Sequence, residues 1–211
     1  MIVGIEAAST DLSVAVTQAD GVLIAEEAWS SDRRQSAELL PRLLALLRRE
    51  ERQLADVTGI AVGTGPGSFT GLRVAMALGK GLAFALRRPI VGVPSLWAWL
   101  ESEPDAPAAV ARAGAREAFV LPRGAELPTV LGSEDVAHRF ASARVVAPAE
   151  LAGAFGLNAS VRPRGAAIVA AEGARRLATA PAGDDLRSLD PVYLRLPRGV
   201  AADTGGAAPW R

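Results

Sequence analysis

A glycine-rich stretch between a short apolar run and a long apolar helix pattern constrains the fold of this chain more than any other feature. The apolar run 60–62 enters it, and Gly63, Gly65 and Gly67 stand around Pro66 before the helix pattern begins. Glycine allows positive φ angles and close backbone approach, whereas proline fixes its own φ. The pattern therefore predicts a strand, a tight turn and a helix start in direct succession.

The helix after this turn has a start signal of its own. Ser68 or Thr70 can accept hydrogen bonds from the first free N–H groups of the helix. Glycine clusters commonly mark strand-to-helix turns. One interpretation is therefore purely structural, namely that the turn lets the helix pack closely on its sheet.

Two phosphate-binding motifs are alternative interpretations of the same turn. The P-loop pattern G-x-x-x-x-G-K-[ST] fails because Ser68, counted from Gly63, and Thr70, counted from Gly65, replace its second glycine. The dinucleotide pattern G-x-G-x-x-G has Ser68 in place of its third glycine, and the next strand pattern, 90–93, ends without an acid. A nucleotide-binding Rossmann module is therefore weakly supported.

The stretch 65–83 resembles the hallmark of the TsaB (YeaZ) family. It reads Gly-Pro-Gly-Ser-Phe-Thr-Gly-Leu-Arg-Val and runs on into Lys-Gly-Leu-Ala. Glu6 stands where the family usually carries Asp, and Arg112 replaces an acid in a weaker match. The resemblance is dense over residues 1–100 and sparse until it returns near the end of the chain. Further segments that resemble the family are 2–10, 36–41, 92–96 and 191–195.

The resemblance implies an α/β protein of the actin-like, RNase H-like (ASKHA) fold, with one full N-terminal lobe and a smaller, degenerate second lobe. It also implies a role in forming N6-threonylcarbamoyladenosine at position 37 of tRNA. The family's catalytic relative carries a pair of metal-binding histidines on its first helix, whereas this chain has Gln35 and no such pair there. The resemblance therefore implies a catalytically silent paralogue.

The hydrophobic pattern supports the same lobe arrangement. It predicts the order β-β-β-α-β-α-β over residues 1–93, a polar, proline-bearing linker at 101–107, and weaker elements beyond it. The predicted domains are an RNase H-like lobe at 1–102, a second lobe at 103–196 and a flexible tail at 197–211. The weaker elements are strands near 108–112, 116–121 and 143–147, and helices near 148–155 and 166–179.

Composition limits the classes of function. The 211 residues have a formal net charge of zero and no cysteine. Disulfides and thiolate chemistry are therefore excluded, and no basic excess indicates a main nucleic-acid surface. The chain opens directly on a strand pattern, and Arg73 and Lys80 interrupt its most apolar helix. We therefore expect a cytoplasmic protein.

Candidate chemical residues are few. Glu6, Ser9 and Thr10 lie at the opening hairpin, where actin-like enzymes hold phosphates, and are possible nucleotide contacts. A single carboxylate without a partner is poorly equipped for phosphoryl transfer. The ordinary alternative for Glu6 is a strand-end carboxylate held by backbone N–H groups. His138 has no second histidine at helical spacing, so we expect no metal site and no catalytic residue.

Two helical segments, 36–54 and 69–86, are predicted to contact another polypeptide. Leucines surround most of the first, and a ridge of small residues four apart follows the second. Helices that are apolar on all sides are buried on more than one side, and monomers seldom expose large apolar patches. The alternative is that the second lobe covers both helices. The predicted partner-binding residues are Leu40, Leu43, Leu44, Leu47, Phe69, Gly71, Leu72, Ala75, Met76, Gly79, Lys80 and Ala83.

The first hypothesis for function is a non-catalytic scaffold or dimerization subunit that supports a TsaD-like catalytic subunit. The resemblance also implies a TsaE-like ATPase as a further partner and a homodimer as a further state. Contact with tRNA would occur only through the complex, and ATP and metal would belong to the partner subunits. The alternative is a small ATP-dependent kinase or hydrolase of the actin-like superfamily that uses Glu6, Ser9 and Thr10.

Overall fold

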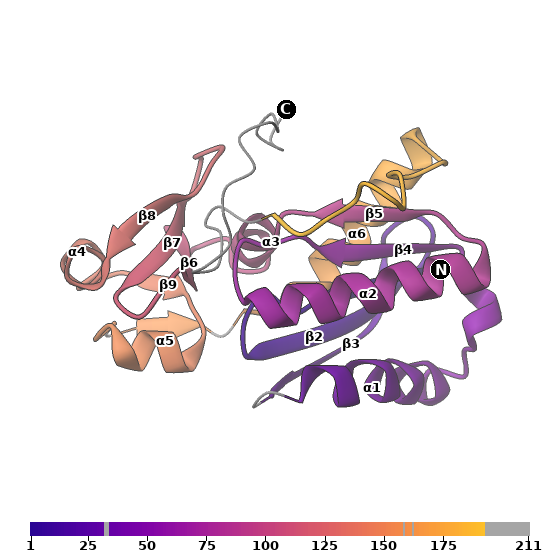
Figure 1. Ribbon diagram of the computed structural model, residues 1–211, viewed down its shortest axis with the longest axis horizontal. Helices are drawn as coiled ribbons and strands as arrows, with labels where there is room; N and C mark the ends of the chain where they lie inside the picture. Colours follow the sequence, from indigo (N-terminus) through magenta and orange to yellow (C-terminus); the bar gives the residue numbers. More distant parts are fainter. Residues whose placement is uncertain (32–33, 158, 162, 193–211) are drawn as a thin grey trace.

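The computed structural model describes residues 1–31, 34–157, 159–161 and 163–192. These residues form two five-stranded sheets with helices packed on them, and the two sheets lie one after the other along the long axis (Figure 1). The predicted tail at 197–211 lies outside the described residues.

The first sheet has the strand order β3-β2-β1-β4-β5. Strand β1 pairs antiparallel with β2 and parallel with β4, while β2 pairs antiparallel with β3 and β4 parallel with β5. This topology confirms the predicted RNase H-like lobe. The strands are β1 (Ile2–Glu6), β2 (Asp11–Thr17), β3 (Leu23–Ser30), β4 (Gly59–Gly63) and β5 (Ile90–Val93).

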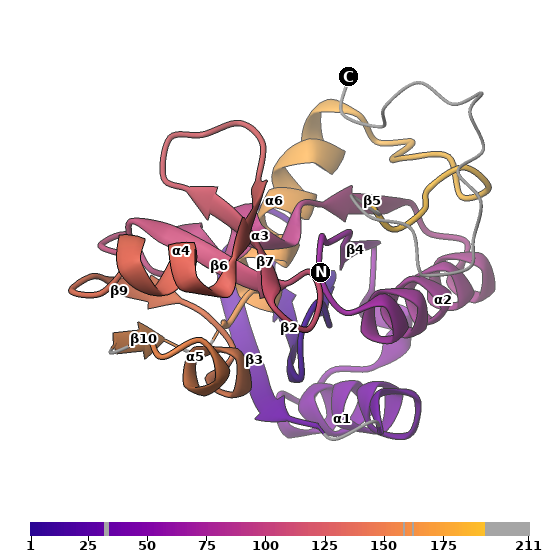
Figure 2. The same ribbon diagram turned by 60° about the vertical axis from the view of Figure 1, so that its left-hand side comes forward.

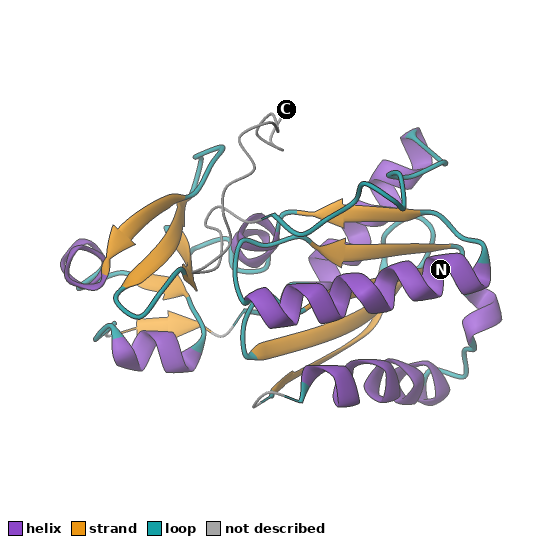
Figure 3. Ribbon diagram, in the orientation of Figure 1, coloured by secondary structure: helices purple, strands orange, loops and turns teal. Residues whose placement is uncertain are grey.

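Helices cover both faces of this sheet. Helices α1 (Gln35–Arg49) and α2 (Phe69–Leu86) lie on one face, and α6 (Ala166–Thr179) lies on the other (Figure 3). Strands β1 and β4 are buried along their whole length, which explains their uninterrupted apolar sequence. Among the described residues, α2 alone has the length and composition of a membrane-spanning helix, but one of its sides packs on the sheet.

The second sheet has the strand order β10-β9-β6-β7-β8. The connecting helix α3 (Ser95–Glu101) leads into it from the first sheet. The sequence patterns did not predict β8, α4 or β10, which are short and carry few apolar residues. The elements are β6 (Ala108–Arg112), β7 (Glu117–Pro122), β8 (Thr129–Gly132), α4 (Ser133–Arg139), β9 (Arg144–Val146), α5 (Ala149–Ala154) and β10 (Ala159–Val161).

The predicted boundary of the second lobe is wrong at its far end. Helix α6 packs against β1, β2, β4 and β5 of the first sheet, so the chain returns to the first lobe. Residues 181–192 then follow the edge of that sheet, where the N–H of Asp184 donates to the carbonyl of Ile90 and the N–H of Val192 to that of Thr64, both at 2.7 Å. The helical period located α6, but it carried no information about which sheet the helix covers.

Candidate functional site

The outer surface of the α1–α2 pair is a predicted site that no other helix or strand among the described residues covers. The two helices lie side by side on the first sheet, and the second lobe lies beyond the end of that sheet (Figures 1 and 2). Helix α1 contacts β2, β3 and α2, while α2 contacts β1, β4, β5 and α1. For the described residues, the alternative that the second lobe covers both helices is therefore wrong.

Most of the predicted partner-binding residues face inward. The ridge of small residues on α2 lies against its own sheet, so a Cβ added at Gly71 would collide with the carbonyl oxygen of Ala7, and one at Gly79 with Val62. The expectation that this ridge faces a partner is wrong, because the small residues are needed to bring the helix close to the strands. The inward-facing members of the set are Leu43, Leu47, Gly71, Leu72, Ala75, Met76, Gly79 and Ala83.

The outer surface presents a mixture of apolar and basic side chains. Leu40 is 36% exposed, and Leu44, Phe69 and Lys80 are half-buried. The Arg73 guanidinium lies 3.9 Å from the centre of the Phe69 ring. A hollow of about 410 Å³ separates α2 from residues 190–191 and is lined by Arg73, Met76, Ala77, Lys80, Asp190 and Pro191. The surface available to another polypeptide is therefore narrower and more polar than the sequence pattern indicated.

The glycine-rich turn serves close packing, as its structural interpretation predicted. Gly65 has a φ of +92° and precedes a cis bond to Pro66, and a Cβ at Gly67 would collide with the carbonyl oxygen of Ala8. The Ser68 hydroxyl caps α2 by accepting a hydrogen bond from the N–H of Gly71 at 3.2 Å. The turn thus holds the start of α2 against the end of β1.

Glu6 is buried at the end of β1, with 1% of its surface exposed. Its Oε1 accepts a hydrogen bond from the N–H of Ala8 at 2.7 Å. Burial raises the pKa of Glu6 to about 7, and the hydrogen bonds from Ala8 and from the Ser95 hydroxyl oppose this rise. The carboxyl group is therefore a strand-end group inside the protein, and it is not presented to solvent.

The possible nucleotide contacts are not brought together. The Ser9 hydroxyl donates to the carbonyl of Asp11 at 2.9 Å and accepts from its N–H at 3.0 Å, which closes the hairpin turn. Thr10 lines a hollow of about 320 Å³ between the lobes, together with Ser30 and Glu150, but Glu6 does not line this hollow. His138 is exposed on α4. No group of three or more metal-ligating side chains is found in the described part of the chain.

Comparison with known proteins places this geometry in a family. Residues 23–158, more than half of the chain, match the TsaD family, described as tRNA N6-adenosine threonylcarbamoyltransferase. The chain belongs to this family. The structure of YeaZ from Pseudomonas aeruginosa superposes with a TM-score of 0.67 and 25% identity, over 92% of this chain and 99% of that chain. This match confirms the predicted TsaB (YeaZ) resemblance and the actin-like, RNase H-like fold.

Curated relatives match shorter stretches of the chain. The TsaB protein of Escherichia coli is 36% identical over 64 residues, which are 30% of this chain and 28% of the relative. An uncharacterised protein of Mycobacterium tuberculosis is 34% identical over 96 residues, which are 45% of this chain and 46% of the relative. This chain thus spans half or less of the length of these curated relatives.

Proposed function

We propose that this chain is a non-catalytic subunit that supports a TsaD-type transferase in the transfer of threonylcarbamoyl to adenosine 37 of tRNA. The observation that carries the proposal is the outer surface of α1 and α2, which no other helix or strand of the described part of the chain covers, in a member of the TsaD family. Relatives from Escherichia coli and Bacillus subtilis are named tRNA threonylcarbamoyladenosine biosynthesis protein TsaB.

The burial of Glu6 supports the non-catalytic part of the proposal. A phosphoryl-transfer site needs carboxylates that reach the metal and the phosphates. Glu6 is turned into the protein, and Ser9 is occupied by its own turn. ATP turnover by the purified chain that disappears in Glu6→Ala would contradict this proposal and support an actin-like kinase or hydrolase.

The proposed partner is a TsaD-type subunit, which packs a helix pair of its own against α1 and α2. A second copy of this chain would use the same surface when that partner is absent. In this proposal a TsaE-type ATPase joins the assembly, ATP and metal bind to the partner subunits, and the assembly works in the cytoplasm.

Replacement of Ala77 by arginine tests the proposed interface. Ala77 is exposed on α2, where arginine is a good helix former, so the isolated chain is expected to keep its melting temperature. A bulky charge at the centre of a packed interface costs roughly 1–3 kcal/mol, so we expect about 10-fold or weaker association with the TsaD-type subunit. Light scattering of the co-purified proteins measures the loss.

The matched control is Ala178→Arg, which adds the same side chain to the exposed side of α6 on the opposite face of the sheet. This variant should associate like the wild type. An unchanged complex mass in Ala77→Arg would show that the outer surface of α2 is not the interface. The ridge positions Ala75 and Gly79 are unsuitable for this test, because bulky residues there would disrupt the lobe itself.

A further inference from the structure

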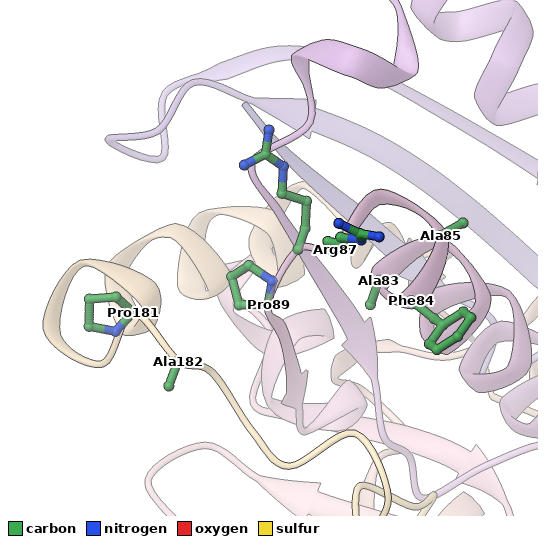
Figure 4. Close-up of a pocket in the computed structure, with 8 residues that line it drawn as sticks. Ala83, Phe84, Ala85, Arg87, Pro89, Pro181 and Ala182 are labelled. Atoms are coloured by element: carbon green, nitrogen blue, oxygen red, sulfur yellow. The ribbon is translucent and has the colours of Figure 1, made fainter.

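A third hollow lies at the C-terminal end of α2, at the end of the sheet opposite Glu6 and the glycine-rich turn. It has a volume of about 790 Å³ and opens between the end of α2, the loop into β5 and the segment after α6. Figure 4 shows Pro181 and Ala182 on one side of the hollow and Phe84 on the other. The residues that line it are Ala83, Phe84, Ala85, Arg87, Arg88, Pro89, Pro181 and Ala182.

Positive charge gathers at this hollow without acidic partners. Arg87 and Arg88 are exposed, and no ion pair joins Arg52, Arg87 or Arg88 to an acid within the described ranges. Burial lowers the pKa of the amino group of Met1, and the charges of Arg52 and Arg88 lower it further. Arg52 and Arg88 therefore each lie close enough to the Met1 amino group to lower its pKa, and Asp56 is the acid that opposes them there.

An exposed aromatic ring lies beside these cations. Phe84 is 78% exposed, the largest fraction among the large hydrophobic side chains in the described part of the chain. Arg87 ends α2 with a φ of +54°, a position where glycine is the usual residue. Helix termination alone would therefore favour glycine at this position. The presence of arginine, despite its less favourable backbone conformation, indicates that its guanidinium group has a separate role.

We propose that the hollow of Phe84, Arg87 and Arg88 binds an unpaired stretch of RNA. The two guanidinium groups would contact successive phosphates, and a base would stack on the Phe84 ring, the combination that single-stranded nucleic acid requires. An acidic protein segment would satisfy the cations but would leave the exposed ring unexplained. The choice of tRNA as the source of the RNA rests on the proposed function, and direct binding departs from the expectation that tRNA is contacted only through the complex. A local patch of this kind is compatible with a net charge of zero.

The double replacement Arg87→Gly with Arg88→Ala tests the proposal in the isolated full chain. Glycine suits the left-handed backbone at position 87, so the melting temperature is expected to stay constant or rise. Fluorescence anisotropy with a labelled tRNA anticodon stem–loop should show at least roughly 10-fold weaker binding. The slope of log Kd against log salt should fall by roughly 1.4–1.8, because two phosphate contacts are lost. Phe84→Ala should weaken binding roughly 5-fold or more.

The matched control is Arg116→Ala with Arg144→Ala, which removes two exposed arginines from the second lobe. Its RNA affinity should equal that of the wild type. Unchanged affinity in the Arg87 and Arg88 variant, or an equal loss in the control, would overturn the proposal. Polyglutamate that competes as well as RNA would also overturn it, in favour of an acidic protein partner.

The two proposals fail separately. RNA binding is measured on the isolated chain, whereas the proposed function is tested by association with the TsaD-type subunit. A wild-type chain that binds RNA but does not associate would refute only the proposed function. A variant that associates normally but has lost RNA binding would support both proposals.

Discussion

Replacing Gly71 with alanine is expected to destabilise the protein by roughly 1–3 kcal/mol or more. The added Cβ would collide with the backbone carbonyl oxygen of Ala7, which belongs to the segment that follows β1 and cannot rotate away. The start of α2 must therefore move off the sheet, which opens the core around Leu72 and Ala75. Urea unfolding of the variant and the wild type at one pH measures the difference.

Gly81→Ala is the matched control on the same helix. A Cβ at Gly81 would have no atom within 4 Å, and the position is exposed. Alanine is favoured over glycine in a helix by roughly 0.8–1 kcal/mol, so this variant is expected to be more stable than the wild type. Equal stability changes in the two variants would contradict the close packing of α2 on β1.

The free energy of unfolding is expected to fall as the pH rises from 5 to 8, because of Glu6. The pKa of this carboxyl group is raised to about 7 in the folded protein by burial, against an ordinary value of 4.5. Between these values the folded state holds a proton that the unfolded state has released, so each increase in pH favours unfolding. The loss amounts to about 2–3 kcal/mol over this range.

Glu6→Gln is expected to remove this pH dependence. The amide is close in shape to the protonated carboxyl group and stays neutral at every pH, so the unfolding free energy of the variant should lack the fall of about 2–3 kcal/mol between pH 5 and 8. In the control Glu134→Gln, on the exposed side of α4, the free energy of unfolding should still fall from pH 5 to 8 as in the wild type. A wild-type profile that rises or stays level over this range would show that the Glu6 carboxyl group is accessible to water.

Two other carboxyl groups, Asp185 and Glu38, change the free energy of unfolding only at more acidic pH. A hydrogen bond from the backbone N–H of Arg187 and one from the Ser188 hydroxyl lower the pKa of Asp185. Hydrogen bonds from Ser31 and Trp29 lower the pKa of Glu38. The stability that these groups contribute is present above their ordinary pKa values and is lost as the pH falls below them. These two groups therefore contribute little between pH 5 and 8. The Met1 amino group, whose pKa is lowered from its ordinary value, acts in the opposite direction to Glu6 in this range, so the difference between the wild type and Glu6→Gln measures the contribution of Glu6.

The first lobe was predictable because its signals are local. Alternating and continuous apolar runs located β1 to β5, and Ser68 with the glycines before it marked the start of α2. The short elements β8, α4 and β10 were missed because they carry too few apolar residues to produce a period. Leu127, just before β8, and Val130, within it, are exposed, so their apolar side chains do not mark a buried face.

The sequence by itself determined the element order of the first lobe, the tight turn before α2 and the resemblance to the TsaB (YeaZ) family, which the comparisons confirm. The tertiary structure decided which side of α2 faces the sheet, where α6 packs and whether Glu6 meets solvent. The physical reason is that periodicity records which residues avoid water, whereas a helix that is apolar on several sides can bury any of them. The side of α2 that faces the sheet is set by the neighbouring strands, which come so close that only glycine fits at positions 71 and 79.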